Sequence, residues 1–328
     1  MTGPIPDGGV GAEDHGGGAT AVVFPGISPS SFAQVGRFLL INPEARRLTA
    51  AADETLGWSL VDRYRQAEGA YSESERVAFL VVCLALAFWA EEALDVRPDI
   101  VIGPSFGGTP AAVYAGALSF PDAVRLTVGW NRHLAEYFAH AHSDVVTQSF
   151  ARTPRARLVE ILGELDEAGE WYETACHVDD DFWMLSVRQH RLDWLQAAVR
   201  ARGGLPLYTM SPPMHSAAFA PLRATVEREL VAGLPFTDPR LPMVSDHDGA
   251  VLTRGEQVRR LLLDGIVRQV RWPGALETLR AHGVSRLCVS GPDGLWGRVD
   301  VARRPFDVLT LTPALALRPR LRQRTLVG

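Results

Sequence analysis

The segment Ile100–Ala117, IVIGPSFGGTPAAVYAGA, constrains the fold of this chain more than any other stretch. A short β-branched run ends in Gly103-Pro104-Ser105-Phe106-Gly107 and passes directly into an Ala-rich segment that is typical of a helix. A strand that turns this sharply into a helix indicates an α/β fold. Because glycine lets two backbones approach where a Cβ would clash, the pattern predicts a tight corner that presents Ser105.

The rest of the chain extends this α/β pattern and interrupts it once. Apolar runs at Ala19–Gly26 and Pro98–Gly103 predict strands, and helical segments lie between and after them. Residues 143–210 instead read strand, helix, strand, strand, helix, strand, which is the ferredoxin-like order. We therefore expect an α/β-hydrolase-like large subdomain, residues 19–142 and 211–316, with an inserted ferredoxin-like small subdomain, residues 143–210. Residues 1–18 and 317–328 are expected to be tails.

Composition narrows the classes of function. The net charge of −5 provides no basic field for nucleic acid or for an anionic membrane surface. The longest apolar run, Val77–Ala90, is shorter than the roughly 20 residues that a membrane-spanning helix needs, so we expect a buried helix. The three cysteines are widely separated, which fits no metal site or disulfide framework and suits the cytoplasm. No nucleotide-binding motif is present, so we expect no cofactor and no metal.

Ser105 lies in the pattern G-x-S-x-G, the nucleophile elbow. The helix that follows it offers free main-chain N–H groups that stabilise an oxyanion. A nucleophilic serine also needs a base, and His215, which follows a strand and a Pro-Pro turn, is the candidate among nine histidines. The alternative interpretation of any single histidine is a surface or core residue.

Several motifs in order resemble the malonyl-CoA:acyl-carrier-protein transacylase family. They are FPG near the start, the serine elbow, AGALSFPDAVRL, the ferredoxin-like insert, MHS at His215, IVRQVRW and SRLCVSGPDG, and they cover about residues 19 to 312. The resemblance implies that Ser105 accepts the acyl group and that His215 is the base. It implies an oxyanion hole from the main-chain N–H groups of Ile27 and Phe106, and a main-chain carbonyl of Gln269 that orients the His215 ring.

The substrate pocket departs from a malonyl pocket. Malonyl-type members carry an arginine 25 residues after the serine to bind the substrate carboxylate, and this chain has Trp130 there. Arg125 and Arg132 are too far round the same helix to replace it. Met214 stands where the family has an aromatic residue, and the pair Pro212-Pro213 before it is expected to shape the pocket rim, with Pro213 in the substrate pocket. A bulky or neutral acyl group is therefore the hypothesis, with the alternative that Trp130 and Met214 only pack the core.

This pattern is similar to the trans-acting, VinK-like acyltransferases of polyketide and macrolactam assembly. The similarity implies transfer of an aminoacyl or dipeptidyl group between two acyl carrier proteins, the donor and the acceptor. Carrier proteins usually present acidic surfaces, so Arg152, Arg155 and Arg298 are candidates for contacting them. We expect a monomer.

Three alternatives stay open from the sequence. The same residues would hydrolyse acyl groups from carrier proteins if water replaced the acceptor thiol. A malonyl-CoA or acyl-CoA transacylase is a second alternative, against which Trp130 argues. A non-catalytic module that docks carrier proteins is the third, and the presence of both Ser105 and His215 disfavours it.

Overall fold

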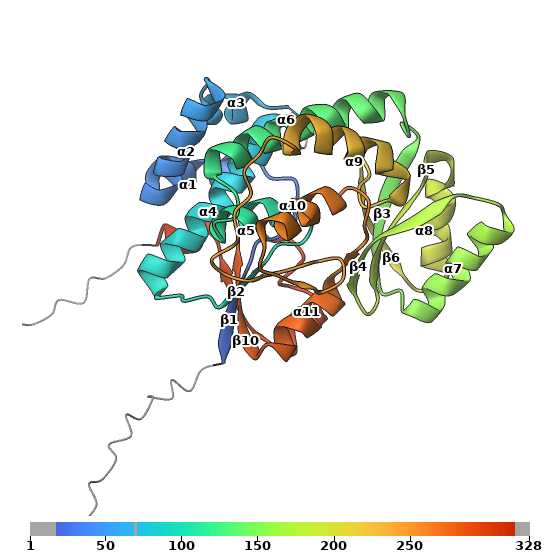
Figure 1. The fold of residues 1–328 in the computed structure, drawn as a ribbon. Coiled ribbons are helices and arrows are strands. Elements are labelled where there is room, and N and C mark those ends of the chain that lie inside the picture. The colour runs from blue at the N-terminus through green and yellow to red at the C-terminus, as the bar shows by residue number, and fades with distance from the viewer. Residues whose placement is uncertain (1–17, 69–70, 319–328) are drawn as a thin grey trace, which may run out of the picture.

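The computed structural model describes residues 18–68 and 71–318. The tails expected at the two ends lie almost entirely outside this part of the chain. Two sheets organise it, and each carries its own helices (Figure 1).

The larger sheet has six strands in the order β11-β10-β1-β2-β7-β8. Neighbouring strands are parallel except for the antiparallel pair β7 and β8. All of β2 and the last three residues of β1 are buried and apolar, as expected for a parallel sheet covered on both faces. The strands are β1 (Ala19–Val23), β2 (Ile100–Ile102), β7 (Met243–Val244), β8 (Val251–Leu252), β10 (Val284–Ser290) and β11 (Asp307–Leu311).

Helix α4 (Glu73–Leu94) is the central helix of the large subdomain. The Ser72 hydroxyl accepts a hydrogen bond from the N–H of Glu75 and so caps the N-terminus of this helix. With 22 residues it is longer than its apolar run, and by length and composition alone it could cross a membrane. In the fold, 67% of its most apolar window is buried inside the protein, which is typical of a core helix.

The other helices of the large subdomain surround α4 and the sheet. Helix α6 (Phe120–His140) lies along one side of α4 and carries residues of the site described below (Figure 1). The remaining helices are α1 (Phe32–Ile41), α2 (Pro43–Leu56), α3 (Leu60–Gln66), α5 (Gly108–Tyr114), α9 (Ala220–Val226), α10 (Gly255–Asp264), α11 (Trp272–Ala281), α12 (Asp300–Arg303) and α13 (Pro313–Ala316).

The small sheet has the order β6-β3-β5-β4-β9. Its strands β3 (Val145–Ala151), β4 (Tyr172–Asp179), β5 (Phe182–Arg188) and β6 (Leu205–Met210) pair antiparallel, with helices α7 (Arg155–Glu167) and α8 (Leu192–Ala201) between them in sequence. This is the ferredoxin-like order that the sequence predicts. The α/β fold with a ferredoxin-like small subdomain is confirmed.

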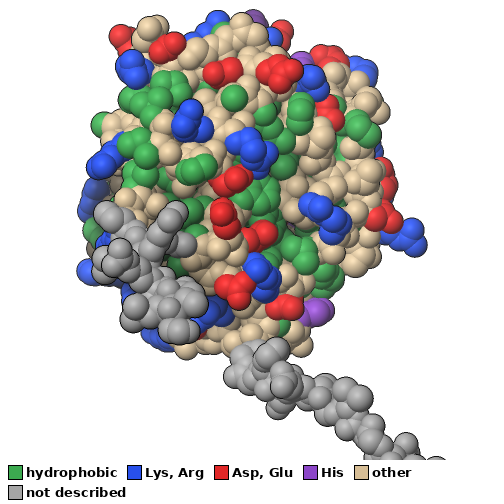
Figure 2. Space-filling model, turned by 90° about the vertical axis from the view of Figure 1, so that its left-hand side faces the viewer, with side chains coloured by type: hydrophobic (Ala, Val, Ile, Leu, Met, Phe, Trp, Pro, Cys, Tyr) green, Lys and Arg blue, Asp and Glu red, His purple; other side chains and the backbone are tan. Residues whose placement is uncertain are grey.

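The fifth strand of the small sheet comes from outside residues 143–210. Strand β9 (Val270–Arg271) pairs in parallel with β4, through Cys176 opposite Val270. The segment between β8 and α11 therefore joins the large sheet to the small one. Figure 2 shows one face of the molecule, on which basic and acidic side chains are interspersed.

Candidate active site

Ser105 lies at the sharp corner between β2 and α5. Its φ of 55° is in the left-handed region, which is strained for a serine and typical of a nucleophile elbow. The two flanking glycines are required by the close packing of the corner. A Cβ on Gly103 would lie 1.9 Å from the carbonyl oxygen of Gly107, and a Cβ on Gly107 would lie 2.0 Å from that of Phe24.

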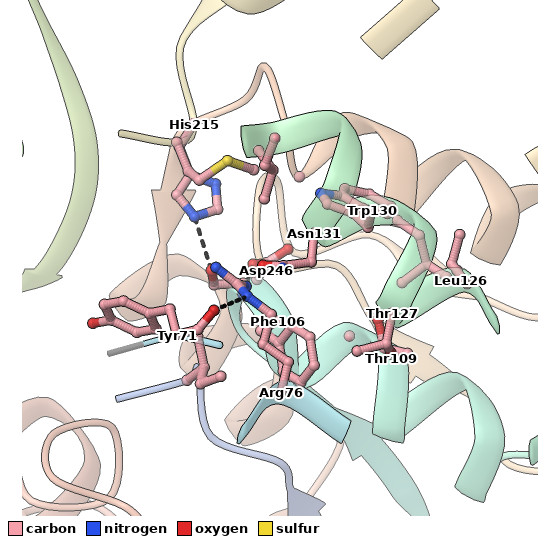
Figure 3. A pocket seen from close by; sticks show the side chains of 18 of the residues that line it. Tyr71, Arg76, Phe106, Thr109, Leu126, Thr127, Trp130, Asn131, His215 and Asp246 are labelled. Carbon is pink, nitrogen blue, oxygen red and sulfur yellow. Dashed lines mark hydrogen bonds between the residues drawn. The ribbon is translucent and has the colours of Figure 1, made fainter. Parts of the chain in front are cut away.

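His215 meets Ser105 across the corner. The Ser105 hydroxyl and Nε2 of His215 are 2.9 Å apart, although the residues are far apart in sequence (Figure 3). His215 also has a positive φ, 64°, and it is buried in a short loop after β6. Glu173 on β4 holds this loop by accepting hydrogen bonds from the Ser216 hydroxyl and from the N–H of Ala217.

The environment of His215 keeps its ring neutral. Burial, aided by the nearby His247, lowers the pKa of His215 to about 3. The main chain at Arg268 and Gly265 lies beside the ring and acts in the opposite direction. A neutral imidazole with Nε2 facing a hydroxyl accepts a proton from it, so the geometry and the charge state both suit a general base.

The prediction that Gln269 orients His215 is wrong. The carbonyl of Gln269 accepts a hydrogen bond from Nδ1 of His247 at 3.2 Å. Nδ1 of His215 has no partner of ordinary hydrogen-bond geometry within the described residues, and the main chain next to its ring belongs to Arg268 and Gly265. The error has a local cause: Gln269 leads directly into β9, and its carbonyl points to the histidine on the neighbouring β7–β8 turn.

Asp246 is a site residue that the sequence analysis missed. Its carboxylate accepts a hydrogen bond from the main-chain N–H of Ser105 at 2.7 Å and lies 3.3 Å from Nε2 of His247, without hydrogen-bond geometry to it. Only 3% of Asp246 is exposed, and burial raises its pKa. Strands β2 and β7 are parallel neighbours, so the residues just past their carboxyl ends meet. This rule about neighbouring parallel strands would have predicted Asp246 as a site residue from the sequence.

Two unpaired main-chain donors belong to residues beside the dyad. The N–H groups of Ile27, after β1, and Phe106, after the nucleophile, have no hydrogen-bond partner among the described residues. Both residues line the pocket that contains Ser105 and His215. This arrangement is suited to an oxyanion, because a developing negative charge would meet two fixed donors that need no reorganisation.

The pocket that opens from Ser105 is mainly apolar. It holds about 980 Å³ of empty space, including open solvent at its mouth. Trp130 and Met214 line it, together with Leu126, Leu134 and Leu262. Of the predicted pair Pro212-Pro213, Pro212 lines the pocket. The assignment of Pro213 is wrong, because successive residues of an extended chain point to opposite sides and Pro213 is buried outside the pocket.

The chain is similar in sequence and fold to known acyltransferases. A model of the VinK acyltransferase small domain matches residues 149–210. The malonyl CoA-acyl carrier protein transacylase of Escherichia coli (strain K12) is 26% identical over 301 residues, 88% of this chain and 94% of the relative. FabD from Acinetobacter baumannii superposes with a TM-score of 0.79 at 19% identity, over 90% of this chain and 95% of that one.

This chain belongs to the malonyl-CoA:acyl-carrier-protein transacylase-like family. It is an acyl-carrier-protein S-acyltransferase family enzyme, and the match of its small domain supports the VinK-like subtype. Polyketide synthase GfsA of Streptomyces halstedii is 28% identical over 290 residues, which are 85% of this chain and 4% of the synthase. A further solved relative, with a TM-score of 0.79 and 21% identity over 91% of this chain and 97% of that one, is a malonyl-transacylase in complex with its type II acyl-carrier protein.

Within this transacylase-like pocket, Trp130 stands where malonyl-type members are expected to have arginine. It lies on α6 beside Thr127 and Asn131, on the wall opposite α4 (Figure 3). Neither neighbouring arginine of α6 lines the pocket: Arg125 pairs with Asp122, and Arg132 pairs with Glu73.

A positively charged side chain from a different helix nevertheless lines the pocket. Arg76, in the first turns of α4, lines it together with Tyr71. In the sequence, the only candidates to replace the missing arginine were Arg125 and Arg132, on the helix that carries Trp130. Helix α4 approaches the pocket through tertiary packing, for which no local sequence signal exists.

The three arginines predicted to contact a carrier protein are on the surface. Arg152, Arg155 and Arg298 are all exposed, and none forms an ion pair with another described residue. Arg298 follows Gly294, Leu295 and Trp296, which line a second, smaller opening onto Ser105 and His215. Their contact with a carrier protein stays a prediction.

No group of three or more His, Cys, Asp or Glu side chains within residues 18–68 and 71–318 is arranged to hold a metal ion. The three cysteines are all buried and unbonded.

Proposed function

We propose that this enzyme moves a non-malonyl acyl group, aminoacyl or dipeptidyl, from one phosphopantetheinylated acyl carrier protein to another in polyketide or macrolactam biosynthesis. The observation that carries the proposal is Trp130 in the pocket wall, at the position where the resemblance to malonyl-type enzymes predicts a carboxylate-binding arginine. An indole cannot compensate the charge of a carboxylate, and an unpaired buried charge costs several kcal/mol.

The first half of the reaction loads Ser105. Nε2 of His215, 2.9 Å from the hydroxyl, accepts its proton while the serine oxygen attacks the thioester carbonyl of the donor. The negative charge on the carbonyl oxygen is stabilised by the N–H groups of Ile27 and Phe106. As the C–S bond breaks, His215 returns the proton to the departing thiolate, which leaves the acyl group on Ser105.

The second half repeats these steps with the acceptor. His215 removes the proton of the acceptor thiol, the thiolate attacks the acyl-serine ester, and the same oxyanion site holds the intermediate. When the C–O bond breaks, the proton on His215 returns to Ser105. The substrate is carried as a phosphopantetheine thioester throughout, so the cycle needs no further cofactor.

The lining of the pocket supports an apolar acyl group of irregular shape. Most of the side chains in its wall are apolar, among them Trp130 and Leu126. Met214 and Met210, both in its wall, adapt to irregular apolar shapes.

A second candidate function is the loading of malonyl or another carboxyacyl group. The observation that favours it is Arg76, a guanidinium inside the pocket that could pair with a carboxylate. The two candidates predict different adducts on Ser105.

Carrier proteins are the proposed partners on both sides of the reaction. The VinK match and the named activity of the Escherichia coli relative support this, and exposed Arg152, Arg155 and Arg298 provide unpaired positive charge for an acidic surface. We place the enzyme in the cytoplasm, as a monomer.

The test is intact-protein mass spectrometry of the enzyme after incubation with separate thioesters. The series contains malonyl-CoA, simple acyl-CoAs, and aminoacyl and dipeptidyl groups on carrier proteins, with Ser105→Ala as the control. We expect a mass increase from aminoacyl or dipeptidyl carriers, none from malonyl-CoA, and none in the control. A malonyl adduct without the others would establish the second candidate, and an adduct on Ser105→Ala would mean that the nucleophile is misassigned.

A further inference from the structure

Arg76 is a charged residue in the acyl pocket to which the reaction described above assigns no role. It rises from the start of α4, on the side of the pocket opposite Trp130, and its guanidinium points into the space in front of the dyad (Figure 3). Its Nε donates to the carbonyl oxygen of Tyr71 at 3.2 Å, and its guanidinium carbon lies 5.5 Å from the centre of the Tyr71 ring. The Tyr71 contacts hold the guanidinium in one orientation.

The neighbouring carboxylate does not form an ion pair with Arg76. One oxygen of Glu75 accepts from the N–H of Ser30 at 2.6 Å, and the other accepts from the N–H of Tyr71. Glu75 acts on Arg76 only through its charge, without a direct contact. The two terminal nitrogens of Arg76 have no hydrogen-bond partner within the described part of the chain, and the pocket is the space that they adjoin.

The free N–H groups of this guanidinium are available to an acceptor from outside the chain. Burial of the side chain lowers the pKa of Arg76, while its terminal nitrogens adjoin the open space of the pocket. A ligand oxygen that replaces water at these donors forms a charge-assisted hydrogen bond. The planar fork of arginine offers two parallel N–H groups to such an oxygen.

We propose that Arg76 is the residue that determines specificity for the acyl group, by donating hydrogen bonds to an amide carbonyl oxygen within that group. This rests on the function proposed above and makes it narrower. A dipeptidyl group carries such an oxygen between its two residues, and so does any other N-acylated aminoacyl group. A free aminoacyl group carries only the thioester carbonyl and an ammonium, which the guanidinium would repel.

The charges around the pocket favour an amide oxygen over a carboxylate. Asp246 is a second buried carboxylate at the pocket, and it is already occupied by the N–H of Ser105. Glu75 is not in the pocket wall, but its charge acts on Arg76 and so offsets part of the positive charge that a substrate carboxylate would meet, while Asp246 lies in the wall itself. A neutral carbonyl oxygen uses the free N–H groups without adding a third negative charge.

The test compares two acyl groups on the same donor carrier protein and measures the rate of Ser105 loading by intact-protein mass spectrometry. One group is dipeptidyl, and the other is a saturated acyl chain with the same number of chain atoms. We expect the wild-type enzyme to prefer the dipeptidyl group, and Arg76→Met to lose about 10- to 100-fold of that preference. Arg76→Lys keeps the charge without the fork and should fall between the two.

A matched control is Arg132→Met on α6. Arg132 pairs with Glu73 outside the pocket, so its removal should leave the preference unchanged. Thermal unfolding of each variant checks the fold. If Arg76→Met does not fold, two results remain: the wild-type preference for the dipeptidyl group and its reduction in Arg76→Lys. The proposal is overturned if the wild-type enzyme shows no preference or if Arg76→Lys does not reduce it.

Three outcomes overturn the role of Arg76. Equal loss of rate for both acyl groups would mean that Arg76 is only structural. An unchanged preference in Arg76→Met would mean that it does not contact the acyl group. A malonyl adduct that requires Arg76 would mean that it binds a carboxylate. The proposed function fails differently: the wild-type enzyme would then load neither carrier-bound group.

Discussion

At the residue scale, the site combines strained and buried groups that are costly outside a functional setting. Ser105 and His215 both have a positive φ, and His215 is 6% exposed with a neutral ring. Asp246 holds the N–H of Ser105, which fixes the corner without using the two N–H groups that face the oxyanion. The nucleophile is therefore positioned by a carboxylate that does not contact the base.

The burial of His215 predicts how loading depends on pH. A neutral histidine in the unfolded chain takes a proton near pH 6.5, while burial lowers the pKa of His215 to about 3 in the fold. As the pH falls from 6.5 towards 3, the unfolded state gains a proton that the folded state lacks, so the fold loses stability in that window. In the folded enzyme the His215 ring stays neutral over this pH range.

We therefore expect the rate of Ser105 acylation to have no inflection near pH 6.5. Rapid-quench loading between about pH 5 and 8 measures it, with the folded fraction checked at each pH. A half-maximal rate close to pH 6.5 would show that the ring titrates as an exposed histidine does.

Asp246 should matter as an acceptor more than as a charge. Asp246→Asn keeps an oxygen for the N–H of Ser105, so we expect most of the loading rate to survive. Asp246→Ala leaves that N–H without its partner and should lower stability by about 1–3 kcal/mol, with a slower loading rate. Chemical denaturation and single-turnover loading measure the two effects. If both substitutions lower the stability and the loading rate equally, the negative charge of Asp246 beside His247 is what matters, and not its hydrogen bond to Ser105.

At the scale of single elements, the elbow depends on glycines that no other residue can replace. Gly107→Ala would place a Cβ 2.0 Å from the carbonyl oxygen of Phe24 on the preceding loop, so something in the backbone must move. We expect a loss of at least about 2 kcal/mol in the free energy of unfolding. Gly163→Ala, in α7 with open space around it, is the control and should be neutral or slightly stabilising. A stable Gly107→Ala would contradict the described packing.

Local patterns predicted the elements well, and tertiary contacts explain what was missed. The order strand, helix, strand, strand, helix, strand in residues 143–210 agrees with the prediction from local patterns, and the corner at Ser105 follows from its glycines. Arg76 could not be predicted, because it precedes the elbow by a whole helix and reaches the pocket only through packing. The error at Gln269 is of the same kind: which histidine a carbonyl faces depends on how β9 joins the small sheet.

At the scale of the whole molecule, both subdomains contribute to the dyad. Ser105 belongs to the large sheet, whereas the loop that carries His215 is tied by Glu173 to the small one. The opening lined by Thr147 and Cys176 from the small sheet and by Ile27 and Trp296 from loops of the large subdomain leads to the same two side chains.

The tie through Glu173 predicts that the small subdomain influences catalysis. Glu173→Gln retains an acceptor and should be mild, while Glu173→Ala frees the loop of His215. We expect Glu173→Ala to lower the loading rate about tenfold, by misplacing the base, with a smaller change in stability. Glu160→Ala, on the exposed surface of α7, is the control. An unaffected loading rate in Glu173→Ala would mean that the large subdomain alone positions His215.

The central claim is that Ser105 and His215 transfer a non-malonyl group from one carrier protein to another. The most direct measurement mixes the enzyme with a dipeptidyl-loaded donor carrier protein and an unloaded phosphopantetheinylated acceptor, and follows the masses of both carriers and the free acid. We predict that the group appears on the acceptor only when Ser105 is present and that malonyl is not transferred. Release of the free acid alone would identify a hydrolase, and transfer of malonyl in place of the dipeptidyl group would contradict the account of the pocket.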